Sequence, residues 1–441
     1  MALRYFEGQK EKFRVASSPD RHARPRSPAN DPQLSRDHAR ARAKVSMTFT
    51  GRPPGACGRP RPGMGTTWAV MKKPRSHWGT PPWTRESIAY RGGPVRATEV
   101  AIIGAGLTGA STAYHLAKRG IAATVFEAGR VAEGASGRTG GLVLEGTAAG
   151  TLEKVDSCLA ELGRLVTAEA IDCGLQLPGC WEIKHTDSPD KPRLPWHDGG
   201  RSVHIAETVS GGVVEPVRLL TGILNRALGL GAEIKEHAPA RRIVTRPRAG
   251  VEFADETIHP EYIVLAANAW LPSLLRDLVK VHSSLTFACA TEPLDSDTLD
   301  TIGLGAGIPF YTADLPYLWG RTIEDGRVIF GSGLVFGTPA QLESSNATGQ
   351  SSHAAIAKLQ NRIRRLHLEL NEVQFSASWG GPIAFTQDAV PLLGRHPSSS
   401  RIIVAGGYSG HGVALSVRVG QLIAQTIADG TPLPDWGALD R

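Results

Sequence analysis

Three short stretches of this 441-residue chain combine glycines with residues that could bind or orient a charged ligand. Residues 104–109 read GAGLTG, residues 133–141 read EGASGRTGG, and residues 406–412 read GGYSGHG. Because glycine has no side chain, backbone amides in such stretches can approach a ligand closely. The sequence therefore predicts a site made largely of backbone, with Arg138 and His411 among its chemically active side chains.

The first stretch has the pattern G-x-G-x-x-G and lies between an apolar run at 100–103 and a predicted helix. Gly104 permits a tight turn, Gly106 lets the backbone approach a pyrophosphate, and Gly109 allows helix and strand to pack closely. The amides that open the helix would bind the anion at the positive end of the helix dipole.

A second predicted strand, AATVFE, ends at Glu127, 18 residues after Gly109. A carboxylate at this place accepts hydrogen bonds from the adenosine ribose of a bound dinucleotide. Strand, glycine turn, helix and acid at this spacing together predict a Rossmann unit.

The later small-residue stretches favour FAD over a nicotinamide cofactor. Residues 133–141 come where a nicotinamide-binding domain would continue with its next helix and strand. Two apolar runs end in small residues, one at 260–270, PEYIVLAANAW, and one before residues 406–412. Small residues would let the end of each strand lie against another group. Elements of this kind, spread from residue 104 to residue 412, suggest one long cofactor across the whole domain.

Together these motifs resemble the FAD-dependent amine oxidase family, which includes D-amino-acid, glycine and sarcosine oxidases. AIIGAGLTG, VFEAG, GASGRTGG, LAANAW, WGGPIAFTQDAVPLLGR and GGYSGHGV carry the resemblance, which runs from about residue 76 to the C-terminus. GASGRTGG and GYSGHGV are most similar to the gamma-glutamylputrescine oxidases of that family. Between Trp181 and His204 this chain is shorter than such relatives, which carry a longer helical excursion there.

The resemblance implies an α/β fold in which a Rossmann-like FAD-binding domain is interleaved with a mixed-sheet α+β substrate domain. The FAD-binding domain would comprise residues 97–170, 205–270 and 380–435, and the substrate domain residues 171–204 and 271–379. In the second domain the sequence predicts two strands around a turn at 317–333 and an amphipathic helix at 353–370.

The resemblance also implies oxidation of the CH–NH bond of a small amine or amino acid, with hydride transfer to flavin and reduction of O2 to hydrogen peroxide. Gamma-glutamylputrescine-like, sarcosine-like and glycine-like substrates all agree with it. Two alternatives stay open. One is an amine or D-amino-acid dehydrogenase of the same fold that passes electrons to a quinone, and the other is a catalytically inert FAD-binding homologue.

Four side chains are candidates for catalysis. His411 would lie beside the flavin ring, where a protonated imidazole would assist oxygen reduction and a neutral one would orient the ring. Arg138 would stabilise negative charge on reduced flavin, or else contact a phosphate or the surface. Tyr408 would contact flavin or substrate. Arg321 would bind a substrate carboxylate through its guanidinium fork, or form a cross-strand salt bridge.

Other conspicuous residues have a simpler interpretation. Trp319, Tyr317 and Trp379 would wall a substrate pocket or be core aromatics of a sheet. Glu215 precedes a proline that starts a predicted helix, so we expect it to cap that helix. Cys289 lies in an apolar run and is expected to be buried, and no cysteine lies in a motif that would face the flavin. These positions predict non-covalent FAD.

The cofactor-binding candidates come from the glycine stretches and the strand ends. They are Gly104, Gly106, Leu107, Thr108, Gly109, Glu127, Ala128, Arg130, Ser136, Gly137, Arg138, Thr139, Gly140, Gly141, Ala240, Ala267, Gly407, Ser409, Gly410, His411 and Gly412. Ala240 is included because family members hold adenine with backbone at this place. No cysteine and histidine spacing resembles a zinc site.

The formal charge of +7 comes from the start of the chain. Residues 1–70 hold 14 basic and 5 acidic residues, and the remainder holds 35 basic and 37 acidic ones, which argues against nucleic-acid binding as the main function. The composition of residues 1–70 predicts disorder, a transit peptide or nucleic-acid arm, or an upstream extension with translation starting at Met47, Met64 or Met71. No apolar run is long enough for a transmembrane helix. The odd count of five cysteines suits a reducing compartment, so we expect a cytoplasmic enzyme.

Overall fold

The computed structural model describes residues 78–83, 98–186, 193–275, 278–313, 316–344 and 350–439. The predictions for residues 1–70 lie outside the described residues, and so does the middle of the stretch between Trp181 and His204.

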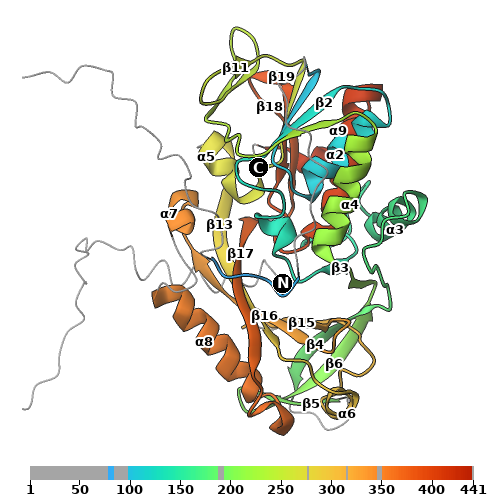
Figure 1. Cartoon of the computed structure of the whole chain (residues 1–441), viewed down its shortest axis with the longest axis vertical. Helices are drawn as coiled ribbons and strands as arrows, with labels where there is room; N and C mark the ends of the chain where they lie inside the picture. The colour runs from blue at the N-terminus through green and yellow to red at the C-terminus, as the bar shows by residue number, and fades with distance from the viewer. Residues whose placement is uncertain are drawn as a thin grey trace, which may run out of the picture. The chain divides into compact units, whose positions relative to one another are not determined.

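Six strands of the described chain form one sheet, which we call the parallel sheet (Figure 1). Its order is β18 (Leu392–His396), β19 (Ser399–Gly406), β12 (Tyr262–Leu265), β1 (Val100–Ile103), β2 (Ala123–Phe126) and β8 (Glu233–Lys235). Neighbouring strands pair in parallel, except that β18 is antiparallel to β19. The VAII sequence of β1 is buried throughout, as expected for a parallel strand that is covered on both faces.

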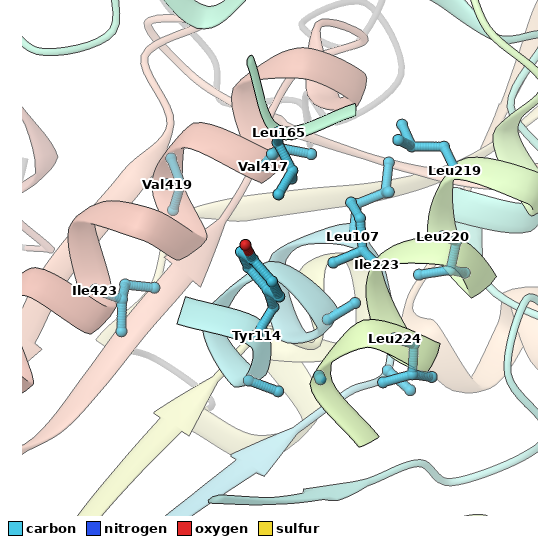
Figure 2. Packing of buried hydrophobic residues seen from close by; sticks show 14 of the residues in the cluster. Leu107, Tyr114, Leu165, Leu219, Leu220, Ile223, Leu224, Val417, Val419 and Ile423 are labelled. Carbon is cyan, nitrogen blue, oxygen red and sulfur yellow. The ribbon is translucent and has the colours of Figure 1, made fainter. Parts of the chain in front are cut away.

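One face of the parallel sheet is covered by helices. These are α2 (Leu107–Ala117), α4 (Pro216–Gly229) and α9 (Gly412–Asp429), and α3 (Cys158–Ala168) packs against α9. Val100 and Ile102 of β1 belong to the core on this side. Figure 2 shows α2 between α4 and α9, with Tyr114 of α2 among the apolar side chains of both neighbours. Helices α2 and α9 approach closely, since the Ser111 hydroxyl donates a hydrogen bond to the Val417 carbonyl at 2.6 Å.

The other face of the parallel sheet meets a smaller antiparallel sheet. Its strands are β11 (Thr257–Ile258), β10 (Gly250–Glu252) and β9 (Arg242–Val244), and η3 (Asn268–Trp270) and α5 (Leu271–Leu275) lie on the same side. Ala101 and Ile103, the alternate residues of β1, join this second core. The alternation along β1 therefore separates two apolar layers.

The second large sheet in the described residues contains eight strands, and we call it the mixed sheet. Its order is β17 (Phe375–Thr386), β13 (Val281–Thr291), β16 (Val328–Phe336), β15 (Trp319–Thr322), β14 (Phe310–Thr312), β4 (Cys180–Thr186), β6 (Arg201–Val209) and β5 (Arg193–Asp198). The pair β14 and β4 is parallel, and the other pairs are antiparallel.

The remaining helices and short elements lie around the two large sheets. Figure 1 shows α8 (Gln350–Arg364) beside β16, and Leu359 and Ile363 of α8 belong to the core on the sheet. The remaining elements are α6 (Ser296–Thr301), α7 (Pro339–Ser344), the ribbon of β3 (Leu142–Leu144) and β7 (Gly211–Val213), and the single turns η2 (Ala135–Gly137), η5 (Leu368–Leu370) and η6 (Asp435–Gly437).

The expected fold class, an α/β unit with a mixed sheet, is confirmed. The two strands expected at 317–333 are β15 and β16, which pair antiparallel. The helix expected at 353–370 ends earlier, because α8 stops at Arg364. Beyond it His367 is extended and its ring accepts the Glu369 amide at 3.1 Å, which opens the separate turn η5.

The domain boundaries stay a prediction, but the sheets show where strands cross them. The boundary drawn after residue 204 falls inside β6, and the boundary drawn before residue 380 falls inside β17. Both strands belong wholly to the mixed sheet. Apolar patterning predicts that a strand exists, but not which sheet it joins.

Candidate active site

The carboxyl ends of four parallel strands meet at one edge of the parallel sheet. Gly104, Glu127, Ala266 and Gly407 directly follow β1, β2, β12 and β19. A methyl group on Gly104 would lie 2.7 Å from the Ala266 carbonyl oxygen, and the Gly407 amide donates to Asn268 Oδ1 at 2.9 Å. The structure thus brings the predicted strand ends together. This edge is where open α/β sheets bind ligands.

Two helices also begin at this edge. The N-cap residue of α2 is Gly106, which has no side chain, and that of α9 is His411, whose side chain makes no cap hydrogen bond. The Leu107 amide of α2 instead donates to Ser136 Oγ at 3.0 Å. The positive ends of both helix dipoles would stabilise negative charge on a ligand here.

Glu127 is held in place by backbone amides. Its Oε2 accepts the Ala105 amide at 3.1 Å, and its Oε1 accepts the Gly129 amide at 2.9 Å. A carboxylate oxygen can accept two hydrogen bonds, so both oxygens can still accept ribose hydroxyls. The amide of the nearby exposed Arg130 donates to Glu133 Oε2 at 3.1 Å.

Residues 134–141, which we call the arginine loop, are held through their carbonyl groups. The Gly137 carbonyl accepts from Trp83 Nε1 at 2.9 Å, and the Arg138 carbonyl accepts from Trp379 Nε1 at 2.9 Å. The Gly140 carbonyl accepts from Arg321 Nε at 2.5 Å. These three donors lie far from the loop in sequence, so tertiary structure fixes its backbone.

Arg138 is buried, with 5% of its surface exposed. Its guanidinium donates to the Gly79 carbonyl at 2.9 and 2.7 Å and to the Gly380 carbonyl at 3.2 Å, and it lies 5.6 Å from the Trp78 ring centre. The surface-contact interpretation of Arg138 is therefore wrong. Its role toward flavin stays a prediction.

Arg321 is 3% exposed and forms an ion pair of 2.8 Å with Glu215. Burial lowers the pKa of Arg321, and the Glu215 carboxylate opposes that shift. A salt bridge therefore exists, but its partner precedes α4 and is not on a neighbouring strand. The expectation that Glu215 caps α4 is wrong. The residue stands at the N-cap of α4, but its carboxylate pairs with Arg321 and makes no cap hydrogen bond.

Tyr408 is almost fully buried in the helical core. Its hydroxyl lies 2.7 Å from Thr108 Oγ1 on α2, and burial raises the pKa of Tyr408 to about 12. The adjacent Ser409 has a φ of +52°, and its Oγ accepts the Thr386 amide at 3.3 Å. Both residues thus join the loop before α9 to α2 and β17. Their contact with flavin or substrate stays a prediction.

His411 lies at the start of α9, next to the exposed Gly410. Burial lowers the pKa of His411 to about 4, so its imidazole is neutral near pH 7. Its Nδ1 is buried and forms no hydrogen bond in the described part of the chain, and the Ser409 backbone near the ring only partly opposes the lowering of the pKa. A buried polar atom without a partner is costly, and a ligand at this edge would supply one. The residues at this edge therefore fit a large cofactor.

The family of the chain follows from comparison with known proteins. The family model described as FAD dependent oxidoreductase (DAO) matches residues 99–208 and 203–426, which include the glycine stretches and both sheets. This chain belongs to the FAD-dependent oxidoreductase family. The family resemblance predicted from the sequence is thereby confirmed.

Relatives of this FAD-dependent oxidoreductase are distant but cover most of its length. Gamma-glutamylputrescine oxidoreductase of Escherichia coli (strain K12) is 24% identical over 75% of this chain and 83% of its own. Glycine oxidase of Bacillus licheniformis is 24% identical over 76% of this chain and 94% of its own. The crystal structure of glycine oxidase from Geobacillus kaustophilus aligns with a TM-score of 0.62 and 19% identity over 79% of this chain and 99% of that one. That structure supports the fold.

Burial of Trp379 favours the core interpretation of that residue, whereas Trp319 and Tyr317 are half-buried and both interpretations stay open for them. Trp379 is 1% exposed. A methyl group on Gly140 would overlap the Trp319 ring, which shows how closely that ring packs on the arginine loop. The Tyr317 hydroxyl contacts Thr286 Oγ1 at 2.7 Å and donates to the Gly333 carbonyl at 2.9 Å.

The remaining cofactor candidates lie on segments joined to these loops. Ala240 follows a segment whose Ala238 amide donates to the Glu127 carbonyl at 2.8 Å. Ala267 is the N-cap residue of η3, and Thr139 Oγ1 lies 3.5 Å from the Gly141 amide. Ala128 directly follows Glu127. The cofactor-binding roles of all these residues stay predictions.

Three residues that contribute to this region were not predicted from the sequence. Trp83 and Gly79 contact the arginine loop from a segment that precedes the family domain, and no local pattern could have indicated this. Asn268 holds the Gly407 amide and has a φ of +42°. Its place in LAANAW, directly after a buried strand, was the available signal.

A surface hollow of about 1000 Å³ lies elsewhere, at the amino ends of β12 and β19. It is lined by residues 245–249, 260–261 and 398–401, including three arginines. One of them, Arg401, already pairs with Glu261 at 2.7 Å. Because ligands of open α/β sheets bind at the carboxyl ends, this hollow is not the candidate active site.

Within the described residues, the free cysteines Cys158, Cys173, Cys180 and Cys289 are all buried. Burial raises the thiol pKa of Cys158 to about 12 and that of Cys173 to about 11. The expectation of a buried Cys289 is confirmed. No described helix has the length and apolar character needed to cross a membrane, and His, Cys, Asp and Glu form no metal-like cluster in the same residues.

Proposed function

We propose that this FAD-dependent oxidoreductase oxidises the CH–NH bond of a small amine or amino acid, reduces O2 to hydrogen peroxide, and holds FAD without a covalent bond. The observation that carries the proposal is the edge of the parallel sheet. There, glycine-ended strands, two helix N-termini and a buried imidazole nitrogen without a partner come together. Gamma-glutamylputrescine oxidoreductase and glycine oxidase, by their names enzymes of amines and amino acids, support the substrate class.

Bound FAD would supply hydride acceptance from the substrate and electron transfer to O2. The protein's own part is binding and electrostatics. Backbone amides at the start of α2 and the fixed carboxylate of Glu127 would bind the phosphate and ribose groups. The start of α9 would stabilise negative charge close to His411.

His411 would act as a neutral imidazole. Its lowered pKa means that a proton on this ring would be lost at neutral pH. A neutral imidazole has one donor and one acceptor nitrogen. We therefore favour the interpretation in which His411 orients the ring system and excludes water, over the one in which a standing positive charge assists oxygen reduction.

The other catalytic candidates support the site from the places described above. Arg138, Tyr408 and Arg321 are buried and make hydrogen bonds within the protein. Because Arg321 already neutralises Glu215, a substrate carboxylate would have to displace that partner. We therefore propose the amine nitrogen and its neighbouring carbon as the features that all substrates share.

Non-covalent FAD is supported by the cysteines. Thiolates are the reactive form of cysteine, and burial raises the thiol pKa of the described cysteines, which keeps them protonated. Acid precipitation should therefore leave colourless protein and a yellow supernatant. Yellow colour retained on the precipitate would contradict this part of the proposal.

One set of flavin spectra tests the function. Purified holoprotein is mixed anaerobically with gamma-glutamylputrescine, sarcosine, glycine or D-amino acids, and loss of the visible flavin absorbance is followed. Bleaching by at least one amine, with peroxide release after oxygen is admitted, is expected. Bleaching without peroxide but with electron transfer to a quinone would favour the dehydrogenase. Failure with every amine would favour the inert homologue.

A further inference from the structure

Residues 78–83, drawn in blue in Figure 1, precede the first residue of the family match. We call them the strap. Trp78 is 1% exposed, and its indole donates to the Leu342 carbonyl at 3.1 Å. Gly79 forms an antiparallel bridge with Trp379 of β17. The strap is therefore docked on the mixed sheet through both side-chain and backbone contacts.

The polar contacts of the strap also reach the arginine loop. The Gly79 carbonyl accepts both terminal nitrogens of Arg138, at 2.9 and 2.7 Å. The Trp83 indole donates to the Gly137 carbonyl at 2.9 Å. The Trp83 ring meets the Trp379 ring edge-on, with centres 5.4 Å apart. Trp379 in turn donates to the Arg138 carbonyl at 2.9 Å.

These contacts act on the loop that supports the start of α2. Ser136, one residue before Gly137, accepts the Leu107 amide at 3.0 Å. Gly137 is itself tightly enclosed, since a methyl group there would overlap Ala132. A shift at Gly137 would therefore move Ser136 and the amide that it holds. Groups that fix the supporting shell of a site commonly control its precision.

We propose that the strap is a positioning segment of the cofactor site, in which Trp83 and Gly79 set the arginine loop for FAD. The functional unit of this protein then includes residues 78–83, although the family match begins at residue 99. This inference rests on the FAD site of the proposed function. It does not depend on which substrate is oxidised or on the electron acceptor.

A strap that served only to cover apolar surface would leave the loop unaffected when its polar contacts are removed. Trp83→Phe removes the hydrogen bond to Gly137 and keeps a ring against Trp379. Trp196→Phe is the matched control. Trp196 is 1% exposed, and its indole donates to the Ile302 carbonyl at 2.8 Å in the core of the mixed sheet.

Each apoprotein is titrated with FAD by flavin fluorescence, and its unfolding in urea is measured without FAD. Trp83→Phe should raise the FAD Kd by about three- to tenfold, the size expected for one lost hydrogen bond. It should also alter the visible spectrum of bound flavin. Trp196→Phe should lower stability in urea and leave the Kd within about twofold of wild type and the spectrum unchanged. Equal Kd changes in the two variants, or none in Trp83→Phe, would overturn the proposal.

A second pair of variants tests the same idea through the backbone. Gly79 has a φ of +78°, and a methyl group there would overlap the Ser378 carbonyl oxygen. Gly120 has a similar φ of +74°, but its methyl group would meet nothing within 4 Å. Gly79→Ala should weaken FAD binding by at least about threefold more than Gly120→Ala. An equal effect would count against the strap.

The same samples separate this inference from the proposed function. If the wild-type protein binds FAD but no amine bleaches its flavin, the proposed function is contradicted. The ratio of the FAD Kd of each variant to that of its control would still decide the role of the strap. Wild-type protein that oxidises an amine, with unchanged Kd values in Trp83→Phe and Gly79→Ala, would remove the strap inference alone.

Discussion

Two glycine-rich loops of this oxidoreductase are held in different ways. The arginine loop, 134–141, offers its carbonyl groups to Trp83, Trp379 and Arg321. The loop at 406–412 is held by the Asn268 side chain and the β17 backbone, and it ends at His411, whose Nδ1 has no partner among the described residues. The first loop is thus tied to the rest of the protein, and the second keeps one polar atom for a ligand.

This difference indicates that the two loops have different roles in the site. Satisfied hydrogen bonds stabilise a fixed geometry, whereas a buried polar atom without a partner is tolerated where a ligand completes it. Changes around the arginine loop should therefore alter stability and cofactor binding. Changes at His411 should alter the behaviour of the bound flavin.

The largest expected effect is at Arg321. Arg321→Met removes the bond to Gly140 and leaves the Glu215 carboxylate without its cation. Breaking a buried ion pair on one side costs about 3–4 kcal/mol in the free energy of unfolding, which urea unfolding of the apoprotein would measure. The double variant Arg321→Met/Glu215→Leu should recover much of this loss. A single variant within about 1 kcal/mol of wild type would show that the pair does not hold the loop.

The next effect is the pH dependence contributed by His411. Its folded pKa of about 4 lies below the ordinary value of 6.5, so the unfolded chain binds the proton more readily. The contribution of His411 to the free energy of unfolding of the wild-type protein is fully present above pH 6.5. It falls by up to about 3 kcal/mol as the pH drops toward 4.

His411→Gln should remove that part of the slope. The comparison of urea unfolding at several pH values isolates His411, because His115, whose pKa burial also lowers to about 4, is common to both proteins. Parallel pH profiles for the two proteins would contradict a lowered pKa for His411 in the folded protein.

A smaller free-energy effect is expected on flavin reactivity. Because the bound flavin would lose a group that orients its ring, His411→Ala should slow reduction of flavin by substrate, or reoxidation of photoreduced flavin by O2, by about tenfold or more, and change the FAD Kd by a smaller factor. Stopped-flow absorbance would measure the rates. His115→Ala, on α2 and outside the candidate site, is the control. If His411→Ala mainly weakened FAD binding, the loop at 406–412 would serve to hold the cofactor and not to control its reactivity.

The smallest expected effect comes from removing residues 1–70. The strap and the family domain both lie beyond this segment. The FAD Kd of the truncated protein should therefore stay within about twofold of the full chain. Loss of flavin on truncation would show that residues 1–70 take part in the site.

The sequence by itself determined the parts of the site that are local. The pattern at Gly104, Gly106 and Gly109 requires a strand, a tight turn and a helix within a few residues, so neighbours along the chain specify it. The same holds for the apolar run that leads to Gly407. Because β1, β12 and β19 are parallel, their ends had to meet at one edge once they joined one sheet.

Only the tertiary structure decided the partners of the long polar side chains. The sequence left Arg138 and Arg321 with alternatives, and folding brought them to the Gly79 carbonyl and to Glu215, 59 and 106 residues away. It also joined Trp83 to the arginine loop. A guanidinium or an indole can reach many acceptors, and which one it meets depends on how distant elements pack.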